Sequence, residues 1–243
     1  MSKKYIVNKV GGGIMVPELL PLVKRELLKQ IRLGFSPVVV VSAIKDVTDT
    51  LITFLNNFSE PTKDKVSIND IENFIVRLKA MHLKLFQSIG VTVEIESQIS
   101  NTIDKLLVLL SNDLKTFLND SASTELEAKI IAYGEKLSAV CASEFFSLNN
   151  LKSVAIFAEN IPVITDNVVK DANIIYPESE KNLQKYMTGV KVIPVIAGFT
   201  GTTTAGTVSR LGRGGTDSTA CFVGAALRAQ KVVLWKDVGA VYS

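Results

Sequence analysis

The apolar positions at the start of the chain alternate between strand-like runs and one helix-like stretch. KYIVNKV (residues 4–10) is rich in β-branched and aromatic residues, which favours a strand. A glycine run ends it, and a helical pattern follows from about 17 to 33, where Gly34 provides a stop. SPVVVVSA (36–43) is apolar at successive positions, as in a strand covered on both faces. This order predicts a βαβ unit with a right-handed crossover.

From about residue 67 to 150 the apolar residues recur at helical spacing. The pattern predicts a helix over 68–90, a second over about 92–118 and a third that begins near residue 124. Thr124 and Glu127 have the spacing of a capping box at the start of the third helix.

Short strand-like runs dominate the last part of the chain. They lie at 153–158, 161–165, 190–199, 206–211 and 231–235, with one helix expected at about 217–228. Strands that alternate with helices predict an α/β fold, a three-layer αβα sandwich with a mainly parallel sheet. We expect a single domain over residues 1–243.

Composition narrows the class of protein. Apolar residues make up 47% of the 243 residues and the mean hydropathy is +0.27, which argues against disorder. No apolar run reaches the roughly 18 residues that span a bilayer. The first strand begins close to Met1, so we expect no signal peptide, a cytoplasmic location, and reduced, buried thiols at Cys141 and Cys221. The net charge of +3 is too small to indicate a nucleic acid or a membrane surface as partner.

The first of three polar loops is NKVGGGIM, which follows the first predicted strand. Backbone N–H groups of a glycine loop can cradle phosphate oxygens, and Lys9 places a cation beside them. The lysine precedes the glycines, so the loop is not a Walker motif. A plain left-handed turn is the alternative interpretation.

The second polar loop, SAIKDVTD, follows the VVVV strand. Ser42, Thr48 and Asp49 are ordinary helix-capping residues, and capping alone could explain them. In open parallel sheets, however, ligands bind at the carboxyl ends of the strands, and two successive strands place both loops on that edge.

The third polar loop is RLGRGGTDSTA. Arg213 offers a planar fork that suits a carboxylate or phosphate, two glycines allow close backbone approach, and Thr216 or Asp217 could cap the next helix. The alternative is that Asp217 is only a cap and Arg213 only a surface charge. Capping does not explain an arginine directly before two glycines, so we favour a binding site.

Glu135 follows Gly134 inside an apolar helical stretch. A glycine within a helix costs about 1 kcal/mol relative to alanine, which indicates a close approach by another group. A carboxylate on a solvated helix face is the alternative. His82, the one histidine, is expected to be structural or exposed, and no cluster has the spacing of metal ligands, so no protein-bound metal is predicted.

Five segments in order resemble the catalytic domain of the aspartokinases, in the amino-acid kinase family. They are KVGGGIM, VVVSAIKDVTD, AYGEKLSA, GFTGTTTAGTVSRLGRGGTDSTA and LWKDVGAVYS. The resemblance covers residues 4–243, and the string LGRGG followed by Thr-Asp is its most specific part. It implies the carbamate kinase-like fold, with an amino-acid part over about 1–190 and the start of a nucleotide part over about 191–243.

The resemblance implies that ATP, carrying Mg²⁺, phosphorylates the side-chain carboxylate of L-aspartate. The product is 4-phospho-L-aspartate, made in the first step of lysine, threonine and methionine synthesis. Lys9 is then expected to neutralise the transferring phosphoryl group and Asp217 to orient the substrate and the lysine. The acceptor site implied by the resemblance comprises Ser42, Thr48, Glu135, Arg213 and Thr216. Glu135 is expected to meet the ammonium group and Arg213 a carboxylate. The implied nucleotide site comprises Gly11, Gly12, Gly13, Lys236, Asp237 and Tyr242.

The sequence departs from the family pattern at several positions. Gly13-Ile14 replaces a Thr-Ser pair, Asp46 replaces a glycine, and Gly239-Ala240 replaces Asp-Gly. We expect no regulatory ACT domains. These departures leave open a non-catalytic or truncated relative that acts as a ligand-binding or assembly subunit, and a kinase of another amino acid. The family also implies a homodimer, although the long helical segment could equally pack within one chain.

Overall fold

The main sheet of the computed structural model, which describes residues 3–58, 66–87, 92–160 and 163–237, is fully parallel. Its five strands have the order β3-β5-β2-β1-β8. Their bounds are Tyr5–Val10 (β1), Ser36–Val41 (β2), Ser153–Ile156 (β3), Ile193–Ala197 (β5) and Lys231–Trp235 (β8). The predicted α/β class with a mainly parallel sheet is confirmed.

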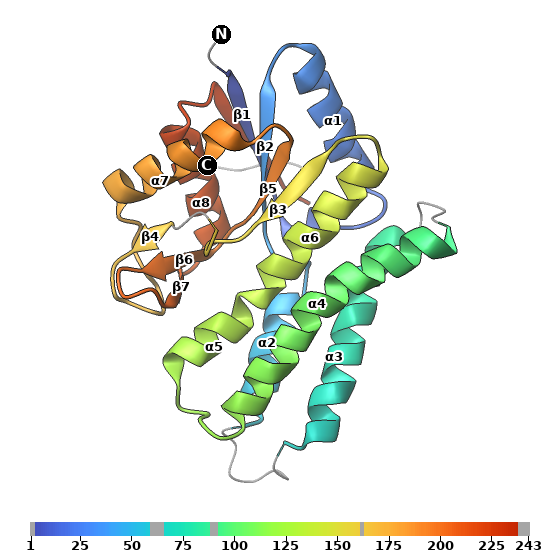
Figure 1. Cartoon of the computed structure of the whole chain (residues 1–243), viewed down its shortest axis with the longest axis vertical. Helices are drawn as coiled ribbons and strands as arrows, with labels where there is room; N and C mark the ends of the chain where they lie inside the picture. Colours follow the sequence, from blue (N-terminus) through green and yellow to red (C-terminus); the bar gives the residue numbers. More distant parts are fainter. Residues whose placement is uncertain (1–2, 59–65, 88–91, 161–162, 238–243) are drawn as a thin grey trace.

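Helices cover both faces of this sheet and complete three layers (Figure 1). The covering helices are α1 (Leu20–Arg32) and α6 (Tyr133–Leu148) on one face, and α7 (Tyr176–Gly189) and α8 (Gly215–Ala226) on the other. Val39 and Val41 belong to the first core and Val38 and Val40 to the second, and all four are fully buried. Because β2 is buried on both faces, its sequence is apolar without alternation.

Four helices extend beyond the end of the sheet (Figure 1). They are α2 (Val47–Asn56), α3 (Ile68–Leu83), α4 (Val93–Phe117) and α5 (Thr124–Ile131). The rings of Phe54 and Phe74 stack at 4.0 Å between centroids and join α2 to α3. No described helix is long and apolar enough to cross a membrane.

A second, three-stranded sheet lies beside the main one. It has the order β4-β6-β7, with bounds Ile164–Thr165, Thr200–Thr203 and Val208–Arg210. β6 and β7 are antiparallel, so the chain turns back after β6 and enters the loop at Leu211. This hairpin delivers the GRGG segment to the edge of the main sheet.

Several predicted boundaries were wrong. The helix expected over 68–90 ends as an α-helix at Leu83 and continues only as a short 3₁₀ turn. The helix expected from residue 124 is two helices that meet at Ala132. The predicted capping box is also wrong, because the Ser123 hydroxyl, one residue earlier, accepts the hydrogen bond from Leu126 N.

Candidate active site

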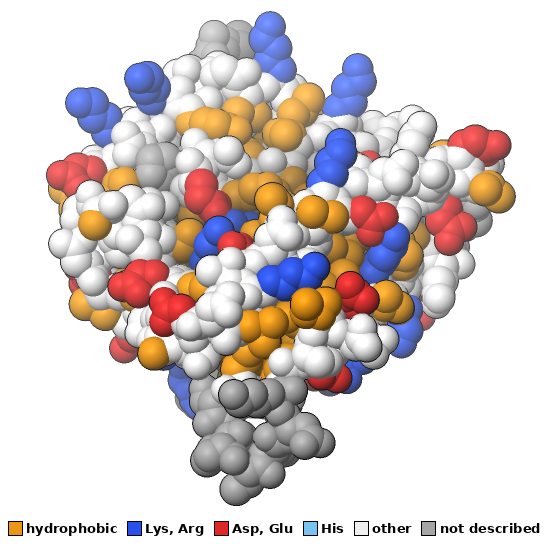
Figure 2. Space-filling model, turned by 60° about the horizontal axis from the view of Figure 1, so that its bottom comes forward, with side chains coloured by type: hydrophobic (Ala, Val, Ile, Leu, Met, Phe, Trp, Pro, Cys, Tyr) orange, Lys and Arg blue, Asp and Glu red, His pale blue; other side chains and the backbone are white. Residues whose placement is uncertain are grey.

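The three polar loops and the start of α6 enclose one cavity of about 420 Å³. It lies at the carboxyl ends of β1 and β2, where ligands of open parallel sheets bind. The residues lining it are Lys9, Ser42, Thr48, Glu135, Asp171, Phe199, Arg210, Gly212, Arg213, Gly214, Gly215, Thr216 and Asp217. A space-filling view turned toward this end of the molecule shows basic and acidic side chains meeting in a hollow (Figure 2). The structure therefore brings together every residue predicted for catalysis and for the acceptor.

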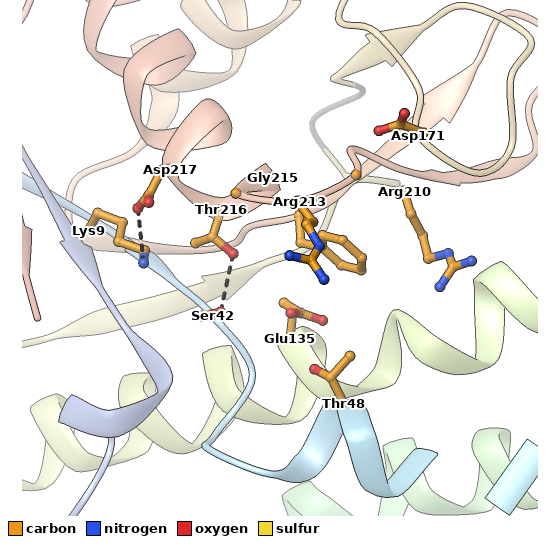
Figure 3. A pocket seen from close by; sticks show the side chains of 13 residues that line it. Lys9, Ser42, Thr48, Glu135, Asp171, Arg210, Arg213, Gly215, Thr216 and Asp217 are labelled. Carbon is orange, nitrogen blue, oxygen red and sulfur yellow. Dashed lines mark hydrogen bonds and ion pairs between the residues drawn. The ribbon is translucent and has the colours of Figure 1, made fainter. Parts of the chain in front are cut away.

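Lys9 and Asp217 form an ion pair across the cavity. Lys9 Nζ lies 2.9 Å from Asp217 Oδ1 (Figure 3), although more than 200 positions separate them in the chain. Lys236 Nζ lies 3.3 Å from the other carboxylate oxygen, Oδ2. Burial alone raises the pKa of Asp217, but the two lysines more than offset it and hold the pKa below its usual range. The carboxylate stays ionised and fixes the ammonium group of Lys9 on the interior strand β1.

The helix α8 begins at the cavity without a side-chain cap. Gly214 is the N-cap, with a positive φ of 75°, so the prediction that Thr216 or Asp217 caps this helix was wrong. Thr216 Oγ1 instead donates to Ser42 Oγ at 3.3 Å. A Cβ on Gly215 would lie only 2.9 Å from side-chain atoms of two neighbours, which allows glycine alone without a shift. The two glycines thus permit a sharp start to α8 at the edge of the cavity, where no side chain caps the helix.

Glu135 is a buried carboxylate with an unused oxygen. Its Oε1 accepts a hydrogen bond from Ala43 N at 3.2 Å, and its Oε2 has no hydrogen-bond partner among the described residues. Burial raises its pKa to about 8, although the bond from Ala43 and the charge of Arg210 act in the opposite direction. Such an oxygen, aimed into a cavity, can accept a bond from a ligand cation.

The glycine before this carboxylate has a packing role. Gly134 lies in the first turn of α6, not inside one long helix as expected. A Cβ there would lie 3.1 Å from Ala43 Cβ, so the loop after β2 approaches the helix closely. Ser138 Oγ donates to Ser42 O at 2.6 Å and fixes the same loop. The close approach inferred from the glycine is confirmed.

Three lining side chains were missed by the sequence analysis. They are Asp171, Phe199 and Arg210. Arg210 Nη2 lies 3.3 Å from Glu127 Oε1, and desolvation lowers the pKa of the guanidinium. A signal existed for Arg210, because it stands three residues before Arg213 in the same string. None existed for the other two, which tertiary packing brings to the cavity.

The residues predicted for the nucleotide lie beside the cavity and do not line it. Gly11 N donates to Trp235 O at 3.2 Å, and the position of a Cβ on Gly12 is occupied by the backbone of residues 43–45. A Cβ on Gly13 would collide with the carboxylate of Asp237, which places that side chain at the glycine turn. Tyr242 lies outside the described residues.

Two of the departures from the family pattern, Ile14 and Asp46, leave the cavity intact, and the third, Gly239-Ala240, lies outside the described residues. Ile14 is buried in the core, and Asp46 does not line the cavity. Asp46 has a φ of 69°, a left-handed conformation that explains why glycine suits this position. Cys141 is buried as expected, whereas Cys221 is exposed on α8, because its helical position faces away from the sheet.

The cavity suits an anion better than a bound metal ion. Lys9 and the uncapped start of α8 offer positive charge and N–H donors at the cavity, and Lys236 adds a second ammonium group beside it. Among the described residues, no group of three or more His, Cys, Asp or Glu side chains could hold a metal. These residues fit an anionic group such as a phosphate.

Solved structures share this fold. The aspartokinase III of E. coli, solved in complex with aspartate and ADP, aligns with a TM-score of 0.78 at 20% identity, over 97% of this chain and 49% of that one. An aspartate kinase of Clostridium acetobutylicum aligns with a TM-score of 0.70 at 17% identity, over 97% of this chain and 48% of that one.

Sequence comparisons find related aspartokinases in bacteria and plants. An aspartokinase of Rickettsia felis is 29% identical over 56% of this chain and 33% of its own length. An aspartokinase of Chlamydia muridarum is 26% identical over 84% of this chain and 42% of its own length. The chain thus spans well under two thirds of the length of these relatives. The family match itself covers residues 4–243, and the chain belongs to the amino acid kinase family.

Proposed function

We propose that the chain transfers the γ-phosphoryl group of ATP to the side-chain carboxylate of L-aspartate. The products are 4-phospho-L-aspartate and ADP. The observation that carries the proposal is the convergence of Lys9, Glu135, Arg213 and Asp217 on one cavity. These side chains match the three charged groups of ATP and aspartate. Lys9 suits the phosphoryl group, Glu135 suits the ammonium group, and Arg213 suits the α-carboxylate.

The residues act by position and charge. A carboxylate oxygen of the acceptor attacks the γ-phosphorus, ADP leaves, and no protein nucleophile is required. Lys9, held by Asp217, neutralises charge on the transferring group. Arg213 pairs with the α-carboxylate of aspartate and Glu135 with its ammonium group, while Ser42, Thr48 and Thr216 complete the acceptor site.

The nucleotide binds on the side of Lys236 and Asp237, next to the glycine turn. Mg²⁺ arrives with ATP, where it shields the phosphate charge. On this proposal the chain acts in lysine, threonine and methionine synthesis. A cytoplasmic location and a homodimer are further predictions of the family resemblance.

Separate calorimetric titrations with ATP–Mg²⁺ and L-aspartate, followed by an assay of ADP release, test the proposal. We expect both ligands to bind and ADP release to depend on aspartate. Lys9→Met should lower kcat by about 10²–10³-fold. The matched control is Lys29→Met, the same change on a side chain that is 68% exposed on α1. Binding without turnover would instead identify a ligand-binding subunit, and aspartate-independent ADP release would point to another acceptor.

A further inference from the structure

Arg210 is the cationic lining residue to which the family resemblance gives no role. In the close view of the cavity, Arg213 and Glu135 lie between Arg210 and the Lys9–Asp217 pair (Figure 3). Arg210 therefore stands at the end of the cavity remote from the phosphoryl group. This end holds two guanidinium groups, whereas one suffices to pair with a single carboxylate.

The backbone of Arg210 is held rigidly. It ends β7, where Arg210 pairs with Thr200 of β6. Its N–H donates to Val169 O at 2.9 Å, and its carbonyl accepts from Ala172 N at 2.7 Å. A side chain on such a scaffold is preorganised for binding, because little order must be created when a ligand arrives.

The side chain of Arg210 keeps unused binding capacity. Its partner Glu127 on α5 also pairs with Lys170, whose Nζ lies 2.7 Å from Glu127 Oε2. One carboxylate is thus shared by two cations, so Glu127 alone does not neutralise both of them. The side chain of Arg210 is only 13% exposed, and its buried Nε has no hydrogen-bond partner among the described residues. A buried donor without a partner is unfavourable, and a ligand oxygen would satisfy it.

We propose that Arg210 is a specificity-determining residue that, together with Arg213, selects an acceptor with a second carboxylate at the end remote from Lys9. Its planar fork suits a carboxylate, and Glu127 holds one edge of the guanidinium while another stays available. This inference rests on the proposed function, and it names the feature that distinguishes aspartate from simpler carboxylic acids.

The test compares two acceptors that differ by that carboxylate. β-Alanine is aspartate without its α-carboxylate and keeps the ammonium group and the reacting carboxylate. Arg210→Gln should raise KM for aspartate by about 10- to 100-fold, the range for a lost hydrogen bond to a charged group. It should leave KM for ATP unchanged. The ratio of kcat/KM for aspartate to that for β-alanine should fall by the same factor, and Arg210→Lys should restore part of it.

The matched control is Glu127→Gln, which removes the ion pair but keeps the guanidinium and leaves an amide oxygen to hold it. We expect an aspartate to β-alanine ratio equal to or above that of the wild type. A purely structural ion pair predicts instead that Glu127→Gln and Arg210→Gln behave alike, or that Arg210→Gln impairs both acceptors equally, and either result overturns the proposal.

A failure of the proposed function can be distinguished from a failure of the role proposed for Arg210. If the wild-type chain transfers no phosphoryl group to aspartate, calorimetric affinities for aspartate and β-alanine replace the kinetic ratio. Equal discrimination by the wild type and Arg210→Gln then overturns the role of Arg210, and a loss of discrimination in the variant supports it.

Discussion

Replacing Glu135 by glutamine tests the electrostatics of the cavity most directly. Burial raises the pKa of this carboxyl from 4.5 to about 8, so between these values the folded chain holds a proton that the unfolded chain releases. The stability contributed by this group is therefore complete below pH 4.5 and is lost as the pH rises through 8. Glutamine has nearly the same shape and no ionisation, so the variant lacks this loss.

The size of the effect follows from linkage. Each pH unit between the two pKa values changes the free energy of unfolding by about 1.36 kcal/mol. Between pH 6 and pH 9, wild-type stability should fall by roughly 3 kcal/mol relative to Glu135→Gln, since the loss ends near pH 8. Urea unfolding of both proteins at pH 6, 7, 8 and 9 measures it. Two curves that stay parallel over this range would refute the reasoning.

The same ionisation should control the acceptor. An ammonium group is bound by the charged form of Glu135, so kcat/KM for aspartate should rise about tenfold per pH unit up to about pH 8. At pH 6 it should stand about 100-fold below the plateau. KM for ATP should not follow this profile. The kcat/KM of Glu135→Gln for aspartate should be low at every pH. A wild-type pH profile of kcat/KM without a rise that levels off near pH 8 would contradict the assigned role.

Asp46 and His82 give two further tests, both by urea unfolding. Asp46→Gly should stabilise the fold by about 1 kcal/mol, because φ is 69° at this position and a Cβ makes that conformation unfavourable. Asp46→Ala keeps the Cβ and should not stabilise the fold. Equal effects of the two substitutions would show that the backbone is not strained at this position. His82 is fully buried and burial lowers its pKa to about 4, so its contribution to stability is present above pH 6.5 and is lost as the pH falls toward 4. Wild type should lose roughly 3 kcal/mol more than His82→Gln between pH 7 and pH 4, and similar losses would show that His82 does not titrate in this way.

The sequence predicted those parts of the fold whose pattern is local. The VVVV run predicted a strand buried on both faces, and Val38 to Val41 are all fully buried. The helix α7 was missed because its sequence, YPESEKNLQKYMTG, carries few apolar residues, and only Ser179, Leu183 and Met187 are buried. A helix that buries so narrow a stripe gives a weak periodic signal.

The sequence predicted those residues of the candidate site that belong to recognisable motifs. Glycines in the same loops marked Lys9, Arg213 and Asp217, and the structure brings all three to one cavity. Arg210 had only its nearness to Arg213 as a signal and Asp171 had none, because their place at the cavity depends on the pairing of β6 with β7 and on the bridge between Lys170 and Arg210. The pKa of Glu135 was equally hidden, since it depends on burial by segments distant in sequence.

Strand β1 lies between β2 and β8, and Lys9 is paired in register with Leu234. During synthesis β2 emerges soon after β1, whereas β8 begins more than 200 residues after the end of β1. Until then one edge of β1 lacks its neighbour, and an unpaired edge invites pairing with other chains. Lys9 can form its ion pair only after Asp217 has been made, so this end of the cavity assembles later than the pairing of β1 with β2.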